Sequence, residues 1–195
     1  MRPMRIALSF LLAPLAAAGT PDSWTVETGP QFQAGTPEKV SILGIGEVAL
    51  APNFDKVYDS PEPYLWSVAL DRAGNVFAGS GNDGKVFKID KDGKASLVFD
   101  AKELQVYALA VGPDGAVYAG TSPKGKIYRI PEGGEAKVFF DPGEEYLWAM
   151  LFDGAGNLYA GTGKNGKIYR VSPEGNGEIW LDSDETHVRS LAFRS

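Results

Sequence analysis

The sequence predicts an all-β protein whose strands belong to a repeated unit. Along the chain of 195 residues, one pattern returns with a fixed 41-residue period that never slips. Each repeat contains four short runs rich in aromatic and β-branched residues, and glycine-containing turns separate the runs. No segment after Ala18 keeps an apolar period of 3.6, so we expect helices to be nearly absent.

The 41-residue spacing is visible in five columns of residues. They are Trp66, Tyr107, Trp148 and Arg189; Gly79, Gly120 and Gly161; Lys85, Lys126 and Lys167; Asp59, Asp100, Asp141 and Asp182; and Glu62, Glu103, Glu144 and Glu185. A fixed period of this length is typical of repeat architectures. We therefore expect three complete units at 59–99, 100–140 and 141–181, a partial unit at 182–195, and a divergent β segment or partial unit at 19–58.

In the first unit the expected strands are Tyr64–Leu70, Val76–Ser80, Lys85–Asp90 and Ser96–Phe99. Glycines take the same turn positions in all three units, where a positive φ would make a side chain clash. They are Gly74, Gly115 and Gly156 after the first strand, and Gly84, Gly125 and Gly166 after the second.

Four short antiparallel strands in each 41-residue repeat predict the blades of a β-propeller. The first strand carries large side chains on one face, such as Trp66 and Val68, and smaller ones on the other, such as Ser67 and Ala69. Apolar residues on both faces suit a blade that packs between neighbours. The Ala-Gly pair that includes Gly79 returns in each unit, and it suits a strand that another backbone approaches closely.

The run YLWSVALDRAGNVFAGSGNDGKVF and its two copies resemble the blades of secreted bacterial β-propellers of the WD-repeat and NHL-repeat kind. The resemblance covers roughly residues 32–195 and concerns the fold. The Trp-Asp pair that ends a WD blade is absent, and Phe99-Asp100 and Phe140-Asp141 stand in its place.

Closure of the propeller has two solutions. An open blade face would leave roughly ten apolar side chains in water, at a cost on the order of 10–20 kcal/mol. The chain is either an open or truncated arc of a longer propeller, which we favour because it stops just after the first strand of a unit, or a four-bladed ring. In the ring, His187–Phe193 would join Val40–Leu43, Glu47–Ala51 and Asp55–Tyr58.

The N-terminal segment 1–18 has the features of a signal peptide. Two arginines precede a mostly apolar stretch, Ile6–Leu15, and Ala16-Ala17-Ala18 provides a cleavage site before Gly19. The stretch is short for a membrane span. We expect a periplasmic or extracellular protein with no membrane insertion after cleavage; an uncleaved N-terminal anchor is the alternative.

Composition excludes several classes of function. The formal net charge of −6 argues against a nucleic acid as partner. The chain has no Cys and a single His, which excludes a disulfide framework, a cysteine nucleophile and a zinc site with several histidines.

The residues of the Glu and Lys columns are expected on the same rim of the predicted propeller. The loops after the second and the fourth strand share this rim, so Glu62 and Lys85 should meet there, as should their copies. We expect ion pairs that serve each blade and contribute ~0–1 kcal/mol each if they are partly exposed. The alternative is a ring of carboxylates at Glu62, Glu103, Glu144 and Glu185 that binds Ca²⁺ or a basic partner; no other cofactor is expected.

Residues at the start of each first strand should lie near the channel mouth. They form two columns: Tyr64, Gln105, Tyr146 and His187, followed by Trp66, Tyr107, Trp148 and Arg189. Aromatic side chains beside an arginine match the composition of binding hot spots. Two interpretations stay open: these residues contact a ligand, or the aromatic ones pack between blades and His187 is a solvated loop residue or a core residue at a strand end.

The leading functional hypothesis is an exported, non-catalytic binding or scaffold module. Its acidic and aromatic rim would hold a protein, a peptide or a glycan, because the sequence offers rigid repeats and no recognisable catalytic set. One alternative is a metal-dependent enzyme of the sugar-lactone hydrolase type, which also uses a propeller. Another is the extracellular sensor portion of a longer signalling protein.

Overall fold

The computed structural model describes Thr28, residues 40–42 and 48–51, and residues 56–193. The chain divides into two compact units, 1–54 and 55–195. The predicted signal peptide lies outside the described residues. Every regular element in the described part is a strand, which confirms the all-β prediction there. Among those residues, none forms a helix with the length and apolarity that a membrane crossing requires.

The described strands form one two-stranded sheet and three four-stranded antiparallel sheets. The first unit holds the pair β1 (Val40–Ile42) and β2 (Val48–Leu50). Blade 1 consists of β3 (Leu65–Leu70), β4 (Val76–Ser80), β5 (Lys85–Ile89) and β6 (Ala95–Asp100). Blade 2 consists of β7 (Gln105–Val111), β8 (Val117–Ser122), β9 (Gly125–Ile130) and β10 (Lys137–Glu144). Blade 3 consists of β11 (Tyr146–Phe152), β12 (Leu158–Gly163), β13 (Lys167–Val171) and β14 (Gly177–Asp182).

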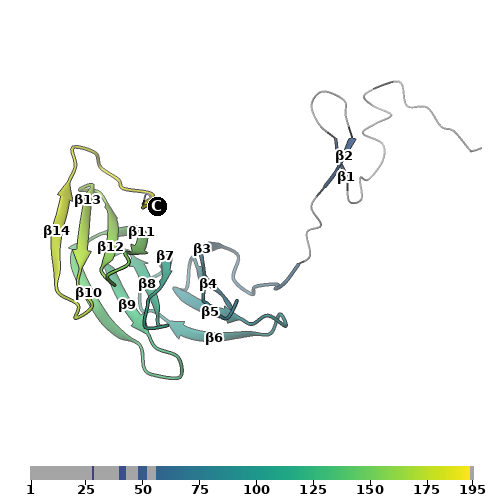
Figure 1. Ribbon diagram of the computed structural model, residues 1–195, viewed down its shortest axis with the longest axis horizontal. Coiled ribbons are helices and arrows are strands. Elements are labelled where there is room, and N and C mark those ends of the chain that lie inside the picture. The colour runs from purple at the N-terminus through teal and green to yellow at the C-terminus, as the bar shows by residue number, and fades with distance from the viewer. Residues whose placement is uncertain (1–27, 29–39, 43–47, 52–55, 194–195) are drawn as a thin grey trace, which may run out of the picture. The chain divides into compact units, whose positions relative to one another are not determined.

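Within the second unit the three blades lie side by side (Figure 1). Their first strands, β3, β7 and β11, lie on the inner side and contact one another in sequence, whereas β6, β10 and β14 lie outermost. Each blade runs in the order first strand to fourth strand. The blades do not close on themselves, so the second unit has the fold of a partial β-propeller.

The predicted fourth blade does not form in the described residues. His187–Phe193 was expected to be a first strand, but its ladder is reduced to a single bridge between His187 and Gly163. A first strand is stabilised by pairing with the second strand of its own blade. The strands that could have taken this place, β1 and β2, pair only with each other. Residues 56–58 are also not a strand. The alternative of a four-bladed ring is therefore wrong for the described part of the chain.

Each blade interface buries one face of a first strand. Val106 of β7 and Leu147 of β11 are fully buried against the preceding blade. Leu65, the equivalent residue in blade 1, is 42% exposed, and Val68 and Leu70 on the same face are exposed as well. The repeated pattern is thus buried only where a neighbouring blade covers it, as the hydrophobic effect requires of a stacked architecture.

The glycines of the second strands sit where the blades approach most closely. A Cβ at Gly79 would lie 2.7 Å from Cγ1 of Val106, and one at Gly161 would lie 2.8 Å from Cγ1 of Val188. This confirms the close approach predicted from the Ala-Gly pairs. It also shows that Val188 takes the place of a first-strand residue against blade 3, and its N–H donates to the carbonyl of Thr162 at 2.9 Å.

The turn glycines follow the prediction at all positions but one. Positive φ angles occur at Gly74, Gly84, Gly115, Gly156 and Gly166. The expectation of a positive φ at Gly125 is wrong. In that hairpin the left-handed residue is Lys124, with φ 63°. The third strand of blade 2 therefore begins at Gly125, one repeat position earlier than the third strands of the other two blades.

Candidate functional site

The first strand of each blade contains a β-bulge at an aromatic residue. The pairing of β3 with β4 runs from Leu65 to Ser67 and skips Trp66. The same shift occurs at Tyr107 in β7 and at Trp148 in β11. A bulge leaves its extra residue unpaired and turns its side chain out of the regular alternation. The three bulges therefore give three aromatic side chains the same new direction.

The bulged aromatic residues join into one continuous stripe. We use the name aromatic stripe for Tyr64, Trp66, Tyr107, Trp148 and Tyr146. Ring centroids are 5.5 Å apart for Tyr64 and Trp66, 5.9 Å for Trp66 and Tyr107, 4.6 Å for Tyr107 and Trp148, and 5.2 Å for Tyr146 and Trp148. The two pairs within a blade are stacked, and the pairs between blades are tilted by 43° to 49°. The stripe thus crosses all three blades.

The stripe remains open to solvent at its blade 1 end. Tyr64 is 53% exposed and Trp66 is 50% exposed, while the three aromatic residues of blades 2 and 3 are half-buried. Large, half-exposed aromatic surfaces in one row are unusual for side chains that only pack a core.

His187 and Arg189 lie at the other end of the stripe. The indole Nε1–H of Trp148 donates to Nδ1 of His187 at 3.3 Å, and the backbone N–H of Lys164 points to the same nitrogen at 3.4 Å. The guanidinium of Arg189 lies 5.2 Å from the Trp148 ring, within the range of a cation–π contact. The structure therefore brings these residues together with the predicted aromatic ones.

Gln105 occupies the equivalent strand position to Tyr64 and Tyr146. It begins β7, opposite Ser122 in the register, and is half-buried. It has an amide group where the other two blades have a phenol ring.

Glycines beneath the tryptophans belong to the candidate site, and the sequence reasoning missed them. A Cβ at Gly81 would overlap the indole of Trp66, and one at Gly163 would overlap the indole of Trp148. Blade 2 has the smaller Tyr107, and there the equivalent residue is Ser122. The 41-residue spacing of Gly81, Ser122 and Gly163 could have revealed this match between indole and glycine.

The Glu and Lys columns form an ion pair in every complete blade. The distance from Lys Nζ to Glu Oε1 is 2.6 Å for Lys85 and Glu62, 3.2 Å for Lys126 and Glu103, and 3.3 Å for Lys167 and Glu144. The carboxylate side chains are only 4–7% exposed. The pairs are confirmed, but the expected ~0–1 kcal/mol applies to exposed pairs; a buried carboxylate that loses its partner costs more.

In blades 2 and 3 a tyrosine shares the carboxylate. The hydroxyl of Tyr128 donates to Oε2 of Glu103 at 3.0 Å, and that of Tyr169 donates to Oε1 of Glu144 at 3.2 Å. Burial, together with the adjacent carboxylate, raises the pKa of both tyrosines to about 12. In blade 1 the equivalent residue is Phe87, and there the hydrogen bond with Glu62 raises the pKa of Lys85.

The fourth residue of the Glu column, Glu185, is exposed, and its backbone carbonyl packs on Gly166. In the described part of the chain, no three His, Asp or Glu side chains gather closely enough to hold a metal ion. Each buried carboxylate of the column is paired with its own lysine.

Comparison with known proteins supports the fold. The sequence matches no protein-family model, and no curated protein matches it. The structure is similar to a solved nidogen/laminin complex, with TM-score 0.60, 19% identity and coverage of 67% of this chain and 52% of that one. It is also similar to a protein assigned to the gluconolactonases on family grounds, with TM-score 0.56, 18% identity and coverage of 76% and 57%.

A third similar structure is regucalcin of Agrobacterium tumefaciens, whose title calls it a calcium-binding protein. The TM-score is 0.55, the identity is 16%, and the match covers 67% of this chain and 48% of that one. The chain thus spans about half the length of the solved structures that it matches. These likenesses are to β-propellers and concern the fold alone.

Proposed function

We propose that the chain belongs to a β-propeller binding module and that the aromatic stripe is its ligand-contacting surface. The observation that carries the proposal is the repetition of the bulge at Trp66, Tyr107 and Trp148. The bulge takes each of these side chains out of the regular alternation of its strand. In each of the three blades one aromatic residue is left out of the strand pairing, and the three side chains lie in one row.

The chemistry of the stripe supports a protein, peptide or glycan as the ligand. Flat aromatic faces stack on sugar rings and on apolar or aromatic side chains of a peptide, and they carry much of the binding free energy in known interfaces. Arg189 adds a cation beside Trp148, and Gln105 adds an amide at the centre. The rigid blades hold these groups in place before binding, which lowers the entropic cost of association.

The proposal is tested by titrating peptides and soluble oligosaccharides while the tryptophan fluorescence is recorded. The variant Trp66→Ala should lower the affinity of a bound probe at least ~10-fold, the effect of a central aromatic hot spot. The matched control is Trp180→Ala, because Trp180 is also an exposed indole, 56% against 50%, but lies on the outermost strand. Equal losses of affinity in both variants would contradict the proposal.

A metal-dependent lactone hydrolase remains the second candidate function. Its support is the likeness to structures named for gluconolactonase and for calcium binding. It predicts a rise in the midpoint of thermal unfolding with Ca²⁺ over EDTA and turnover of simple sugar lactones. A binding module of the kind proposed here would show neither effect.

The predicted export fits this function. A chain without cysteine needs no disulfide formation in an oxidising compartment. The proposal therefore includes a periplasmic or extracellular location and a partner that is neither a nucleic acid nor a membrane. Fractionation of cells that express the full chain tests the location.

A further inference from the structure

The interface between blades 1 and 2 contains a cavity on the side away from the Glu–Lys rim. Its volume is about 290 Å³. Its apolar wall comes from both blades and consists of Phe77, Val98, Val117, Ile130 and Pro131. An apolar cavity of ~150 Å³ is large enough for benzene, so this one accommodates a single ring with a short substituent.

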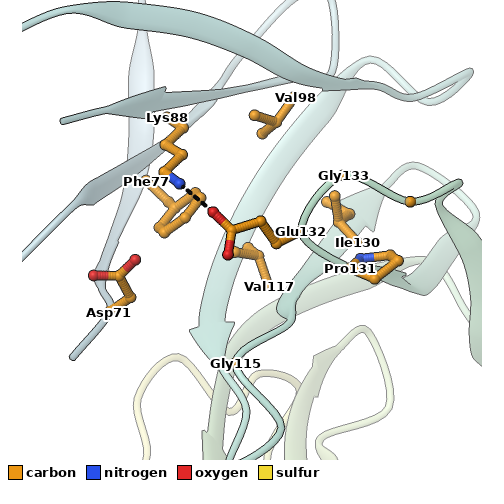
Figure 2. Close-up of a pocket in the computed structure, with 11 residues that line it drawn as sticks. Asp71, Phe77, Lys88, Val98, Gly115, Val117, Ile130, Pro131, Glu132 and Gly133 are labelled. Carbon is orange, nitrogen blue, oxygen red and sulfur yellow. Dashed lines mark hydrogen bonds and ion pairs between the residues drawn. The ribbon is translucent and has the colours of Figure 1, made fainter. Parts of the chain in front are cut away.

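The mouth of the cavity carries one ion pair between the blades. Nζ of Lys88 lies 2.8 Å from Oε1 of Glu132 and 6.0 Å from the centre of the Phe77 ring. Figure 2 shows the Glu132 carboxylate reaching from the end of β9 to Lys88 across this opening. The Glu132 side chain is 84% exposed, whereas that of Lys88 is 25% exposed. The lysine is therefore the fixed member of the pair, and the glutamate is easily replaced.

In the interface between blades 2 and 3, aromatic side chains occupy the position that corresponds to the cavity. Two of the lining residues have larger equivalents 41 positions later: Tyr118 stands for Phe77, and Phe139 stands for Val98. The rings of these two residues meet edge to face at 5.0 Å, and the Tyr118 ring also meets Phe152 at 4.9 Å. The second interface is thus packed with an aromatic ring at the place where the first has only a valine.

The two blades also differ in the ion pair that the equivalent basic residue makes. Arg129 is the equivalent of Lys88, and it pairs with the carboxylate of Asp114 at 2.6 Å. The equivalent of Asp114 in blade 1 is Ala73, and the equivalent of Glu132 in blade 3 is Pro173. The first interface therefore has a valine where the second has an aromatic ring. Its lysine pairs with an exposed glutamate of the neighbouring blade, whereas Arg129 pairs with a carboxylate of its own blade.

We propose that the cavity between blades 1 and 2 binds a small aromatic carboxylate. The ring of the ligand lies against Phe77, Val98 and Val117, and its carboxylate takes the place of Glu132 on Lys88. A ligand of this kind places a ring where the other interface has Phe139, and it gives Lys88 a carboxylate as Asp114 gives one to Arg129. This site is separate from the aromatic stripe and does not depend on it.

Asp71 also lines the cavity, but its charge is already engaged. Its Oδ1 accepts the backbone N–H groups of Ala73 and Asn75, and its Oδ2 accepts Nδ2 of Asn75 at 2.7 Å. Burial opposes ionisation of this carboxyl, but the hydrogen bonds outweigh it and lower the pKa of Asp71. Asp71 thus serves the turn after β3, and Lys88 is the group that selects the charge of the ligand.

The test uses phenylacetate, with 2-phenylethanol, phenethylamine and acetate as comparison probes. Binding is measured by calorimetry and by amide NMR shifts. Phenylacetate should bind at least ~10-fold more tightly than 2-phenylethanol, since a hydrogen bond to a charged group is strong. The shifts should centre on Gly115, Gly133 and Gly134, which line the cavity. Tighter binding of phenethylamine, or no shift at these glycines, would overturn the proposal.

Two variants separate the ring from the charge. Val98→Phe supplies the missing ring and should abolish binding, whereas Leu97→Phe, on the neighbouring exposed residue, should leave the affinity within ~2-fold. Lys88→Met should remove the preference for phenylacetate over 2-phenylethanol, and Lys91→Met, an exposed lysine nearby, should not. A folded Val98→Phe protein with unchanged affinity would contradict the proposal, and the Lys88→Met result decides if Val98→Phe fails to fold.

Removal of the competing glutamate gives the sharpest result. Glu132→Gln should strengthen phenylacetate binding by ~1.5- to 5-fold, because the exposed ion pair no longer has to be broken. An unchanged or weakened affinity would show that the ligand does not take the place of Glu132 on Lys88, and it would overturn the proposed pose.

Discussion

The interface between blades 1 and 2 and the interface between blades 2 and 3 use the same strands in the same register, but they fill their space differently. Both bury a first-strand residue completely, Val106 in one and Leu147 in the other. The second adds the rings of Tyr118, Phe139 and Phe152, while the first leaves a cavity.

This difference separates two roles of a repeat. Positions that recur in every blade set the distance and angle between blades, because each blade can bury its faces only against another copy. Positions that occur once decide what the space between the blades contains. The cavity arises from such single changes, whereas the aromatic stripe is built from a bulged position that recurs in every blade.

Loss of a shared interface residue should have the largest effect. Leu147→Ala removes a fully buried side chain between blades 2 and 3 and should lower the free energy of unfolding by ~2–5 kcal/mol. The control is Leu65→Ala at the same repeat position in blade 1, where the side chain is exposed, with an expected loss under ~1 kcal/mol. Urea unfolding measures both values, and equal losses would contradict the packing described here.

A methyl group at the closest approach should act more strongly in the first interface than in the second. In Gly79→Ala the new Cβ would lie 2.5 Å from Oγ of Ser67 and 2.7 Å from Cγ1 of Val106, so overpacking should cost ~1–3 kcal/mol. In Gly120→Ala the nearest contact is 3.2 Å, to Cβ of Leu147, and the cost should stay below ~1 kcal/mol. Chemical unfolding measures the loss of unfolding free energy in the two variants. A larger loss in Gly120→Ala than in Gly79→Ala would show that the closest approach between blades lies in the second interface.

Exchanging the residue types at the equivalent positions Val98 and Phe139 should make the packing of each interface resemble that of the other. Phe139→Val opens the packed interface and should cost ~1–2 kcal/mol of unfolding free energy. Val98→Phe fills the cavity and should gain ~0.5–1 kcal/mol. Thermal and urea unfolding measure both effects, and a loss of stability in Val98→Phe would mean that the cavity cannot accept a ring in this orientation.

The repeated part of the structure could be predicted from the sequence because its period is a local signal. The strand expected at Lys85–Asp90 forms at Lys85–Ile89, and the one expected at Ser96–Phe99 forms at Ala95–Asp100. The same period placed Tyr64, Trp66, Tyr107 and Trp148 together. His187–Phe193 failed as a strand because a strand needs a partner, and the periodic pattern does not show whether one is present.

The bulges and the cavity were beyond sequence reasoning for different reasons. A bulge at Trp66 is a property of the pairing between β3 and β4, and alternation within β3 alone does not reveal it. The cavity depends on the summed volume of side chains from two blades. The exchange of Phe139 for Val98 is visible in the aligned repeats, but only the structure shows that both face a blade interface.

The smallest expected effect is a difference in pH dependence between the two interfaces. Burial, and then the negative charge of Asp114, raises the pKa of Tyr118 above its usual value of 10.0. The protonated phenol therefore stabilises the fold fully below pH 10, and this stability is lost as the pH rises above that value. The first interface has Phe77 at this position and no such dependence. The loss due to Tyr118 at pH 10.5 is at most ~0.8 kcal/mol.

Tyr118→Phe isolates this contribution, because Tyr128 and Tyr169, whose pKa values are also raised, to about 12, stay unchanged in the variant. Between pH 9 and pH 10.5, the unfolding free energy of the variant should fall less steeply than that of the unmodified protein. Amide hydrogen exchange should place the difference at Leu158 and Val171, which face Tyr118, and not at Val117 and Ile130 in the first interface. Parallel slopes would mean that Tyr118 titrates as it does in the unfolded chain, and the contrast between the interfaces would then rest on packing volume alone.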